Sequence, residues 1–508
     1  MREESFKSRY FVKIASSVAI GALNIVIQIL LPRTLSVEEF GYYSYNLNIF
    51  TSTVVLANLS MSNAFVAKFS RRNDEIGLVY FYLKYYVAEI ILLSIGLIVF
   101  FNFDFVQKTF VGQTITMVFL GLEAAATIKF LADVVSIYDA MAIAKVSAFF
   151  QILLKLFVCA FVVLSYFIGR LSLPLFYIGQ CTITFAITFI LLLNILKYQK
   201  KQYPAVKTES TRFYSEEYAR FCRPLIISSV LSQIIIIVMN WCLMQFSGAK
   251  EQAMFGAAWQ LNALVTYVFA PYAELSKREY SIISKDNEAL IGFYNSSLKR
   301  MFWLTAYFAC FIGFCNDWVL NIVYGDKYLG AGIVTLLIMI YTIYQAWGQM
   351  SGSFMLATER TKMSATIGIV GQFITLGLVF VFQIPNFIWP NGLGSVGIAL
   401  VYVVGNFINV CLSVWLTTRA IGMSSVKALR IQFFPMLLCS SLAFSLNKMM
   451  NLIATEMTMT SSILKLFFAG MIYTIIILVL FYLFPSQIDC SKEKIRDIIK
   501  LVTRVSPI

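Results

Sequence analysis

The chain has 508 residues, of which 59% are hydrophobic and 13% charged, whereas soluble domains carry roughly 25% charged residues. A chain this long with so few charges cannot cover a water-soluble surface, so a soluble globular protein is excluded. The net charge of +14 does not indicate nucleic acid as a partner, because Lys and Arg accumulate in the cytoplasmic loops of membrane proteins.

The apolar residues fall in blocks of about 20, the length that crosses a hydrocarbon core of about 30 Å. These blocks predict an all-α polytopic membrane protein with fourteen spans. The spans are expected near residues 12–32, 40–60, 78–101, 113–133, 145–168, 173–195, 224–246, 254–274, 300–324, 329–349, 364–384, 393–416, 431–449 and 461–484. The charged N-terminal stretch has no small-residue cleavage site, which favours a tail before an uncleaved first span.

Basic residues predict the orientation of the spans. If the N-terminus lies inside, the inner segments carry thirty of the 40 Lys and Arg residues and the outer loops carry six. This asymmetry predicts that both termini are cytoplasmic.

Internal similarity predicts how the spans are grouped. "SSV…EEFGYY" at 16–43 is echoed by "SSV…AMFGAA" at 228–258, and "KVSA" at 145–148 by "KMSA" at 362–365. The offset is nearly constant and covers six spans, so we expect two parallel six-helix lobes plus two C-terminal helices, a transporter layout. The predicted parts are an N-lobe (1–195), a cytoplasmic interlobe linker (196–223), a C-lobe (224–416), spans 13 and 14 (417–484), and an amphipathic basic tail (485–508). The tail is expected to lie on the inner leaflet, or alternatively to pack on the bundle itself.

Charged side chains within the spans are the first candidate functional residues. Glu89, Glu123 and Lys155 all lie about 15 Å deep, near the bilayer midplane, in consecutive spans of the first lobe. Lys84 and Lys129 lie about two turns nearer the cytoplasm. Such charges usually face a cavity and carry function. Two other interpretations remain: an ion-pair network that only locks helices together, and snorkelling of Lys84 and Lys129 to the inner interface.

Amides and aromatic residues take the place of charges in the second half of the chain. The candidates are Gln233, Asn240, Trp241, Trp259, Gln260, Asn262, Gln345, Trp347 and Gln349. Each could instead serve helix packing or the interfacial aromatic belt. Histidine is absent, and the nine cysteines lie mostly within apolar runs without paired spacing. The sequence therefore predicts no metal site and no cofactor.

The first hairpin, "LPRTLSVEEFGYYSYNL", resembles that of polysaccharide flippases in the multidrug/oligosaccharidyl-lipid/polysaccharide exporter superfamily. The matching residues are Arg33, Leu35, Glu38, Glu39, Phe40, Gly41 and Tyr43. "ARFCRPLIISSVL" (219–231), "FGAAWQLNALV" (255–265) and "ATERTKMSATIGIVGQF" (357–373) are similar to the family's seventh, eighth and eleventh helix regions. Ser60 and Ser62 depart from the family's usual glycines, so the second helix is expected to end less tightly.

This resemblance implies a transporter without enzymatic activity. It would move a lipid-linked oligosaccharide, on undecaprenyl pyrophosphate, from the inner to the outer leaflet of the bacterial cytoplasmic membrane by rocking of two lobes. Lys155, Lys129, Lys84 and Arg33 would bind the anionic head group. Sugars would contact Asn240, Trp241, Trp259, Gln260, Asn262 and Gln345.

Coupling to H⁺ would run through Glu89 or Glu123; Na⁺ or the membrane potential are alternatives. Other membrane proteins of polysaccharide assembly, such as those for O-antigen, are possible partners.

Three other functions fit parts of the pattern. A multidrug or cation antiporter of the same superfamily would need mainly anionic or aromatic cavity walls, whereas the first lobe mixes cations with acids. A peptidoglycan-precursor flippase also has fourteen spans, but its arginine-rich first helices are not matched, since Asn24 and Gln28 lie in the first span here. A membrane glycan polymerase or ligase would need a large outer loop with a nucleophile and base, and the predicted outer loops are short.

Overall fold

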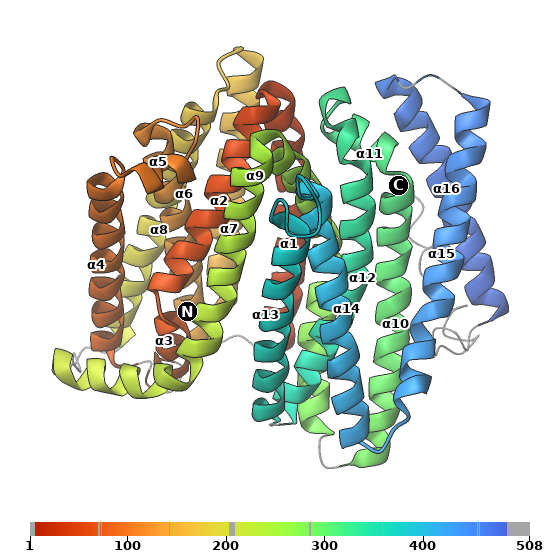
Figure 1. Cartoon of the computed structure of the whole chain (residues 1–508). Coiled ribbons are helices and arrows are strands. Elements are labelled where there is room, and N and C mark those ends of the chain that lie inside the picture. The colour runs from red at the N-terminus through yellow and green to blue at the C-terminus, as the bar shows by residue number, and fades with distance from the viewer. Residues whose placement is uncertain are drawn as a thin grey trace, which may run out of the picture. The chain divides into compact units, whose positions relative to one another are not determined.

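The computed structural model describes residues 6–69, 72, 74–141, 143–202, 209–283, 286–358, 360–454, 456 and 458–484. Across these ranges the chain forms sixteen α-helices and one 3-10 helix, and no strand (Figure 1). The predicted all-α class is therefore confirmed. The predicted basic tail, 485–508, lies outside the described residues.

The helices follow one another along the whole chain. Their bounds are α1 Phe6–Thr34, α2 Val37–Ala57, α3 Met61–Phe69, α4 Ile76–Phe100, α5 Asp104–Thr109, α6 Ile115–Ala140, α7 Ala144–Phe167, α8 Leu173–Gln202, α9 Thr211–Ile282, α10 Asn287–Phe314, α11 Asn316–Val323, η1 Asp326–Ala331, α12 Gly332–Ala357, α13 Thr361–Gln383, α14 Gly394–Ala420, α15 Ser425–Ile453 and α16 Met459–Leu483.

Eleven helices of the described chain are long and apolar enough to cross a membrane. The pair α10 and α11, bent by 79°, makes a twelfth if it is one broken span. Helix α9 counts once, although Gly248 interrupts it at φ 83° and separates the predicted seventh and eighth spans. Helix α2, at 21 residues, is long enough but carries two acids and several amides and hydroxyls. Every predicted span thus lies on a helix, and the chain is a multi-pass membrane protein.

The Arg33–Tyr43 motif is the turn between α1 and α2. Ser36 caps α2, because its hydroxyl accepts from the Glu39 N–H (3.2 Å) while the Glu39 carboxylate accepts from the Ser36 N–H (2.9 Å). This reciprocal pair satisfies two donors that the helix start would leave without a partner. It explains why an acid follows the turn between two apolar helices.

Glycine permits a close approach between α2 and α9. A Cβ on Gly41 would overlap the backbone carbonyl of Ala249, and a Cβ on Gly256 would overlap the side chain of Ser44. These glycines belong to the two Phe-Gly pairs of the internal similarity. Each therefore serves the same purpose, which is to let the two helix segments touch.

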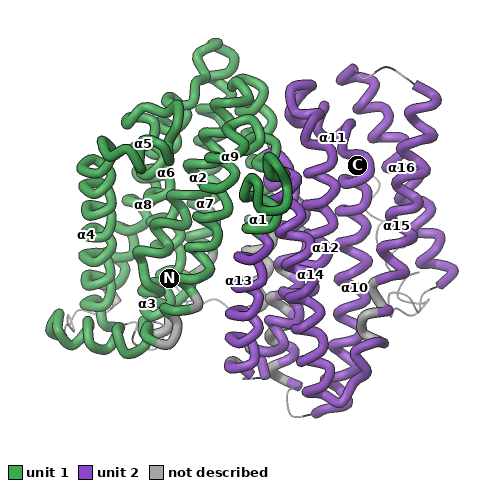
Figure 2. Tube along the Cα trace, viewed as in Figure 1, with its two compact units in different colours: residues 1–256, 379–395 green, residues 257–378, 396–508 purple. Residues whose placement is uncertain are grey.

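The described chain divides into two compact units (Figure 2). Unit 1 comprises Met1–Gly256 and Val379–Ser395, and unit 2 comprises Ala257–Leu378 and Val396–Ile508. In unit 1, α1 packs on α7, and α6 packs on α2 and α8; in unit 2, α10 packs on α12 and α15, and α11 on α16. The predicted linker, 196–223, is mostly helical, because α8 continues to Gln202 and α9 begins at Thr211. The lobe boundaries given by the internal similarity remain a prediction.

The first turns of α9 lie across one end of unit 1 before the helix turns along the bundle (Figure 1). Tyr214, Tyr218 and Cys222 recur at helical spacing and are buried. The Phe81 ring of α4 lies 5.6 Å from the Tyr214 ring and 5.2 Å from the Tyr218 ring, centroid to centroid. An apolar stripe thus docks this segment on unit 1.

Ion pairs also hold the same segment. The Glu217 carboxylate accepts from Lys68 Nζ at 2.9 Å and from Arg72 at 2.6 Å, and Arg72 also pairs with Glu75 at 3.2 Å. Partial burial works against the charge, but the hydrogen bonds from Lys68 and Arg72 prevail and lower the pKa of Glu217. The Tyr214 hydroxyl donates to Glu75 at 2.5 Å, and burial chiefly raises its pKa to about 12. We call the contacts of Lys68 and Arg72 with Glu217 the α3–α9 clamp.

Candidate functional site

The candidate site begins at the turn between α2 and α3, at the end of the second predicted span. Leu59 (φ 48°) and Ser60 (φ 66°) both adopt the left-handed conformation that favours glycine. The turn is held because the Asn58 carboxamide oxygen accepts from the Ser62 N–H (2.9 Å) and the Ser62 hydroxyl (2.8 Å). Backbone strain of this kind clusters at functional sites, where the surroundings maintain it.

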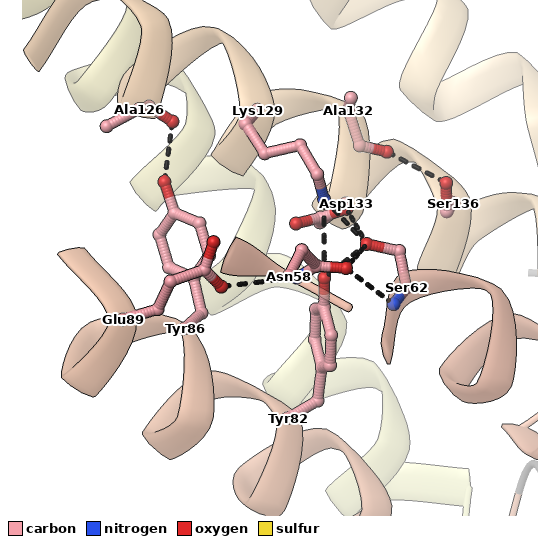
Figure 3. Close-up of polar contacts among 10 residues, drawn as sticks. All are labelled: Asn58, Ser62, Tyr82, Tyr86, Glu89, Ala126, Lys129, Ala132, Asp133 and Ser136. Carbon is pink, nitrogen blue, oxygen red and sulfur yellow. Dashed lines mark hydrogen bonds and ion pairs between the residues drawn. The ribbon is translucent and has the colours of Figure 1, made fainter. Parts of the chain in front are cut away.

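Six polar residues from this turn, α3, α4 and α6 form one connected group (Figure 3). We call it the polar cluster: Asn58, Ser62, Tyr82, Glu89, Lys129 and Asp133. Lys129 forms an ion pair with Asp133 four residues along α6 and donates to the Ser62 hydroxyl at 2.6 Å. The Ser62 hydroxyl also lies 3.1 Å from Asp133 Oδ1 and 2.8 Å from the Tyr82 hydroxyl.

Glu89 joins the polar cluster through one hydrogen bond. Its Oε2 accepts from the Asn58 amide at 3.2 Å. Its other oxygen, Oε1, is buried and has no protein donor, and the same is true of Asp133 Oδ2. The side chains of Asn58, Glu89 and Asp133 are 2%, 6% and 5% exposed. Two buried carboxyl groups therefore each have an oxygen without a hydrogen bond, which is unusual in proteins.

The structure brings together only two of the charged residues predicted from depth, Glu89 and Lys129. Glu123 is on a different part of α6 and accepts from the Ser94 hydroxyl at 3.2 Å. Lys84 is exposed, on the face of α4 that also presents Tyr80 and Val87. Arg33 lies in the last turn of α1 and is half-buried.

Lys155 lies at the middle of α7 and is half-buried. Among the residues the structure describes, it has no carboxylate partner. Lys129 is the opposite case, since Asp133 neutralises it. The two lysines thus have the same charge and similar positions along their helices but different electrostatic surroundings.

The amides and aromatics predicted for sugar binding fall into two groups, one in each unit. In unit 1, Asn240 Oδ1 accepts from Asn48 (3.1 Å) and Gln252 (2.9 Å), and the Trp241 indole donates to the Thr109 hydroxyl at 3.3 Å. Both amides that meet Asn240, from Asn48 and Gln252, were missed, because only the fold brings them to it.

In unit 2, the Trp259 ring lies 4.8 Å from the Tyr402 ring and 5.7 Å from the Tyr341 ring. Asn262 Oδ1 accepts from the Thr342 hydroxyl at 2.8 Å, and Gln260 from the Tyr324 hydroxyl at 3.4 Å. The Gln345 side-chain oxygen is buried without a donor. Among the described residues, the other predicted amides and tryptophan, Gln233, Trp347 and Gln349, do not extend the contacts of Trp259, Gln260 and Asn262.

Sequence reasoning missed four members of the polar cluster: Asn58, Ser62, Tyr82 and Asp133. The spacing of Lys129 and Asp133, four residues apart on one helix, is the signal that could have identified the ion pair. Within the described ranges no three His, Cys, Asp or Glu residues come close enough to hold a metal ion. The cluster can bind and exchange a proton, but it offers too few anionic ligands for a multivalent metal.

No protein-family profile and no curated protein sequence matches the chain. Solved structures do match it. The lipid II flippase MurJ in its inward closed conformation aligns with a TM-score of 0.69 and 16% identity, over 92% of this chain and 99% of that chain. The chain has the fold of a membrane transporter.

Two further structures agree with this. An inward-facing multidrug resistance MATE family transporter of the MOP superfamily has a TM-score of 0.60 and 15% identity, over 82% of this chain and 95% of that one. A MOP superfamily transporter from Pyrococcus furiosus, described by the reverse polarity of its binding pocket, has a TM-score of 0.54 and 13% identity, over 83% and 98%. These similar proteins are transporters and flippases rather than enzymes.

Proposed function

We propose that this protein flips a lipid-linked oligosaccharide of the undecaprenyl-pyrophosphate type from the inner to the outer leaflet. Transport would proceed by alternating access of the two lobes, in the bacterial cytoplasmic membrane and with both termini cytoplasmic. The likeness in fold to a lipid II flippase supports a large amphiphilic lipid substrate. The resemblance of the Arg33–Tyr43 hairpin to polysaccharide flippases supports a glycan head group destined for surface polysaccharide.

The observation that carries the proposal is Lys155. A lysine at the middle of a membrane span is expensive to keep, so it is retained where an anion compensates it. No described carboxylate does so. A pyrophosphate group supplies the missing negative charge, and its attraction to an ammonium is strong in a low-dielectric site. Lys129 is less available for this role because Asp133 already pairs with it.

Unit 2 supplies groups suited to sugars. Trp259, Tyr341 and Tyr402 offer aromatic faces, on which the apolar face of a pyranose stacks. Gln345 offers a buried carbonyl oxygen that a hydroxyl group would satisfy. We propose that these residues, with Gln260 and Asn262, contact the glycan, and that Asn240 and Trp241 contribute from unit 1.

A cation or multidrug antiporter is the second candidate, favoured by the buried acids Glu89 and Asp133 and by the MATE transporters among the similar structures. Such a substrate is positively charged, and Lys155 without a partner would repel it. The two candidates therefore predict opposite effects of removing this lysine.

The test is flipping in proteoliposomes that contain a fluorescent undecaprenyl-pyrophosphate oligosaccharide. Removing one partner of a buried charge pair costs roughly 2–5 kcal/mol, so Lys155→Ala should slow flipping by about tenfold or more. Lys155→Arg should restore part of the rate, and Lys84→Ala, which removes an exposed lysine of α4, should leave it unchanged. If Lys155→Ala only lowers the amount of folded protein, or speeds transport of an organic cation, the proposal is wrong.

A further inference from the structure

The polar cluster contains one more potential negative charge than positive charge. Glu89 and Asp133 are two carboxyl groups, and Lys129 is the one cation that contacts the cluster among the described residues. If both acids were ionised, the cluster would carry a net charge of minus one in the interior of unit 1. That charge would rest on oxygens of which two, Glu89 Oε1 and Asp133 Oδ2, receive no protein hydrogen bond. Burying a charged group in this condition costs several kcal/mol.

The groups that face Glu89 come from its own helix and from the elements packed against it. Tyr85 and Tyr86 lie on α4, Asn58 precedes α3, and α6 contributes Lys129 and Asp133. Tyr85 donates to the Ala57 carbonyl (2.9 Å) and Tyr86 to the Ala126 carbonyl (2.5 Å). Since both tyrosine hydroxyls are committed to backbone oxygens, neither stabilises a Glu89 carboxylate.

The cluster favours Asp133 over Glu89 as the ionised acid. Asp133 has the ion pair with Lys129, and the Ser62 hydroxyl lies 3.1 Å from its Oδ1. Glu89 has one neutral amide donor, Asn58. The ammonium group of Lys129 therefore pairs with Asp133. For Glu89, burying the protonated acid costs less free energy than burying the carboxylate.

The chemistry of the cluster suits a proton better than a metal cation. Sodium or a divalent ion needs several oxygen ligands, and an ammonium group beside the site repels it. Here Lys129 and the Asn58 amide group are donors, and the Ser62 hydroxyl already accepts from Lys129. A proton needs one oxygen, and Glu89 Oε1 is buried and available.

We infer that Glu89 is an exchangeable proton-binding site, and that the Lys129–Asp133 ion pair is its fixed electrostatic partner. In the state described here the Glu89 carboxylate has taken up one proton on Oε1 to become a carboxylic acid; release returns the carboxylate and the proton to water. The binding site itself does not depend on the proposed function. Its use to drive flipping does.

The strained turn gives this proton a mechanical consequence. Asn58 links Glu89 to Ser62, which in turn contacts Lys129 and Asp133. A Glu89 carboxylate would demand more donors than Asn58 alone provides, and the nearest are on the Ser62 side of the turn. Proton release would therefore draw on the same hydrogen bonds that hold Leu59 and Ser60 left-handed, and would shift α3 against α4.

Infrared difference spectroscopy tests the site without any transported substrate. The purified full-length protein in lipid nanodiscs is titrated from acidic to alkaline buffer, and the carbonyl stretch of buried carboxylic acids is followed. Wild type and Glu123→Gln, the matched control on a neighbouring span, should show one band that is lost as its proton dissociates. Glu89→Gln should lack this band, and Asp133→Asn, which removes the carboxylate that pairs with Lys129, should lose the band at lower pH than wild type.

A second measurement needs no variant. Dicyclohexylcarbodiimide reacts with protonated carboxyl groups in apolar surroundings, and mass spectrometry should map the adduct to Glu89, with labelling reduced in alkaline buffer. An unchanged band in Glu89→Gln, a band in Asp133→Asn that titrates as in wild type, or protection from the reagent by Na⁺ at constant pH would overturn the inference. If the band behaves as expected while glycan flipping is absent, the proton site stands and the proposed substrate is wrong.

Discussion

Replacing Glu217 by glutamine should release the first turns of α9 from unit 1. The substitution keeps the size of the side chain but removes the negative charge that Lys68 and Arg72 share. The three side chains are 23%, 25% and 32% exposed, so solvent screens the clamp only in part. Fully exposed pairs contribute roughly 0.2–1 kcal/mol each, and hydrogen bonds to charged groups about 1.5–3 kcal/mol. Allowing for the exposure, we expect a loss of about 1–2 kcal/mol, since one carboxylate serves both bonds.

This loss corresponds to about a 5- to 30-fold increase in the undocked population of the segment, at 1.4 kcal/mol per factor of ten. Amide hydrogen exchange followed by mass spectrometry measures it directly as faster exchange of the peptide 211–223. Peptides of α16 should exchange as in wild type. The matched control is Glu216→Gln, one residue away, because its pair with Arg212 is 63% and 89% exposed and should contribute little. Equal acceleration in both variants, or none in Glu217→Gln, would refute the clamp as the element that docks the segment.

The pH dependence of the clamp follows from the lowered pKa of Glu217. A carboxyl group whose pKa is lower in the folded state contributes stability above its ordinary value, 4.5, and loses it as the pH falls through the lowered value. Exchange of 211–223, corrected for the intrinsic rate, should therefore stay constant from neutral pH to mildly acidic pH. A rise in that range would mean that another group holds the segment.

Three further predictions concern packing, strain and topology. Gly41→Ala should lower the thermal unfolding temperature in detergent, because overpacking against the Ala249 backbone costs about 1–3 kcal/mol. The control Gly96→Ala should leave this temperature unchanged, because its new Cβ meets nothing within 4 Å. Ser60→Gly should raise the unfolding temperature, because glycine removes about 1 kcal/mol of left-handed strain; a decrease would show that the Ser60 side chain matters more than its backbone. An exposed cysteine introduced as Ser210→Cys should resist an impermeant maleimide added outside intact cells, and clear labelling would reverse the predicted orientation.

The sequence predicts the helices well because each span is a long apolar block, and membrane length restricts the possible boundaries. It predicts their breaks less well. Gly248 breaks α9 between the predicted seventh and eighth spans, whereas the turn at Leu59 and Ser60 ends α2 within the predicted second span, and α3 follows beyond it. Both breaks depend on a few backbone angles, which hydropathy does not report.

The site was predicted only in part because depth in the membrane says nothing about direction around a helix. Lys84 and Lys129 were placed at the same depth, yet Lys84 is exposed and Lys129 is paired with Asp133. Asn58 and Ser62 matter because a tight turn brings their side chains to Glu89 and Asp133. Such contacts join α2, α3, α4 and α6, and no local pattern in the sequence indicates them.

The proposed roles of Glu89 and Lys155 predict that proton binding and head-group binding strengthen each other. Both residues belong to unit 1, on α4 and α7, with the neutralised Lys129–Asp133 pair on α6 between them in the sequence. A proton on Glu89 makes the field of unit 1 more positive by one charge, and this favours an anion at Lys155. By linkage, an anionic head group at Lys155 must favour the proton at Glu89 by the same factor. Proton and pyrophosphate should therefore bind the same conformation together, and loss of the proton should weaken the hold on the head group.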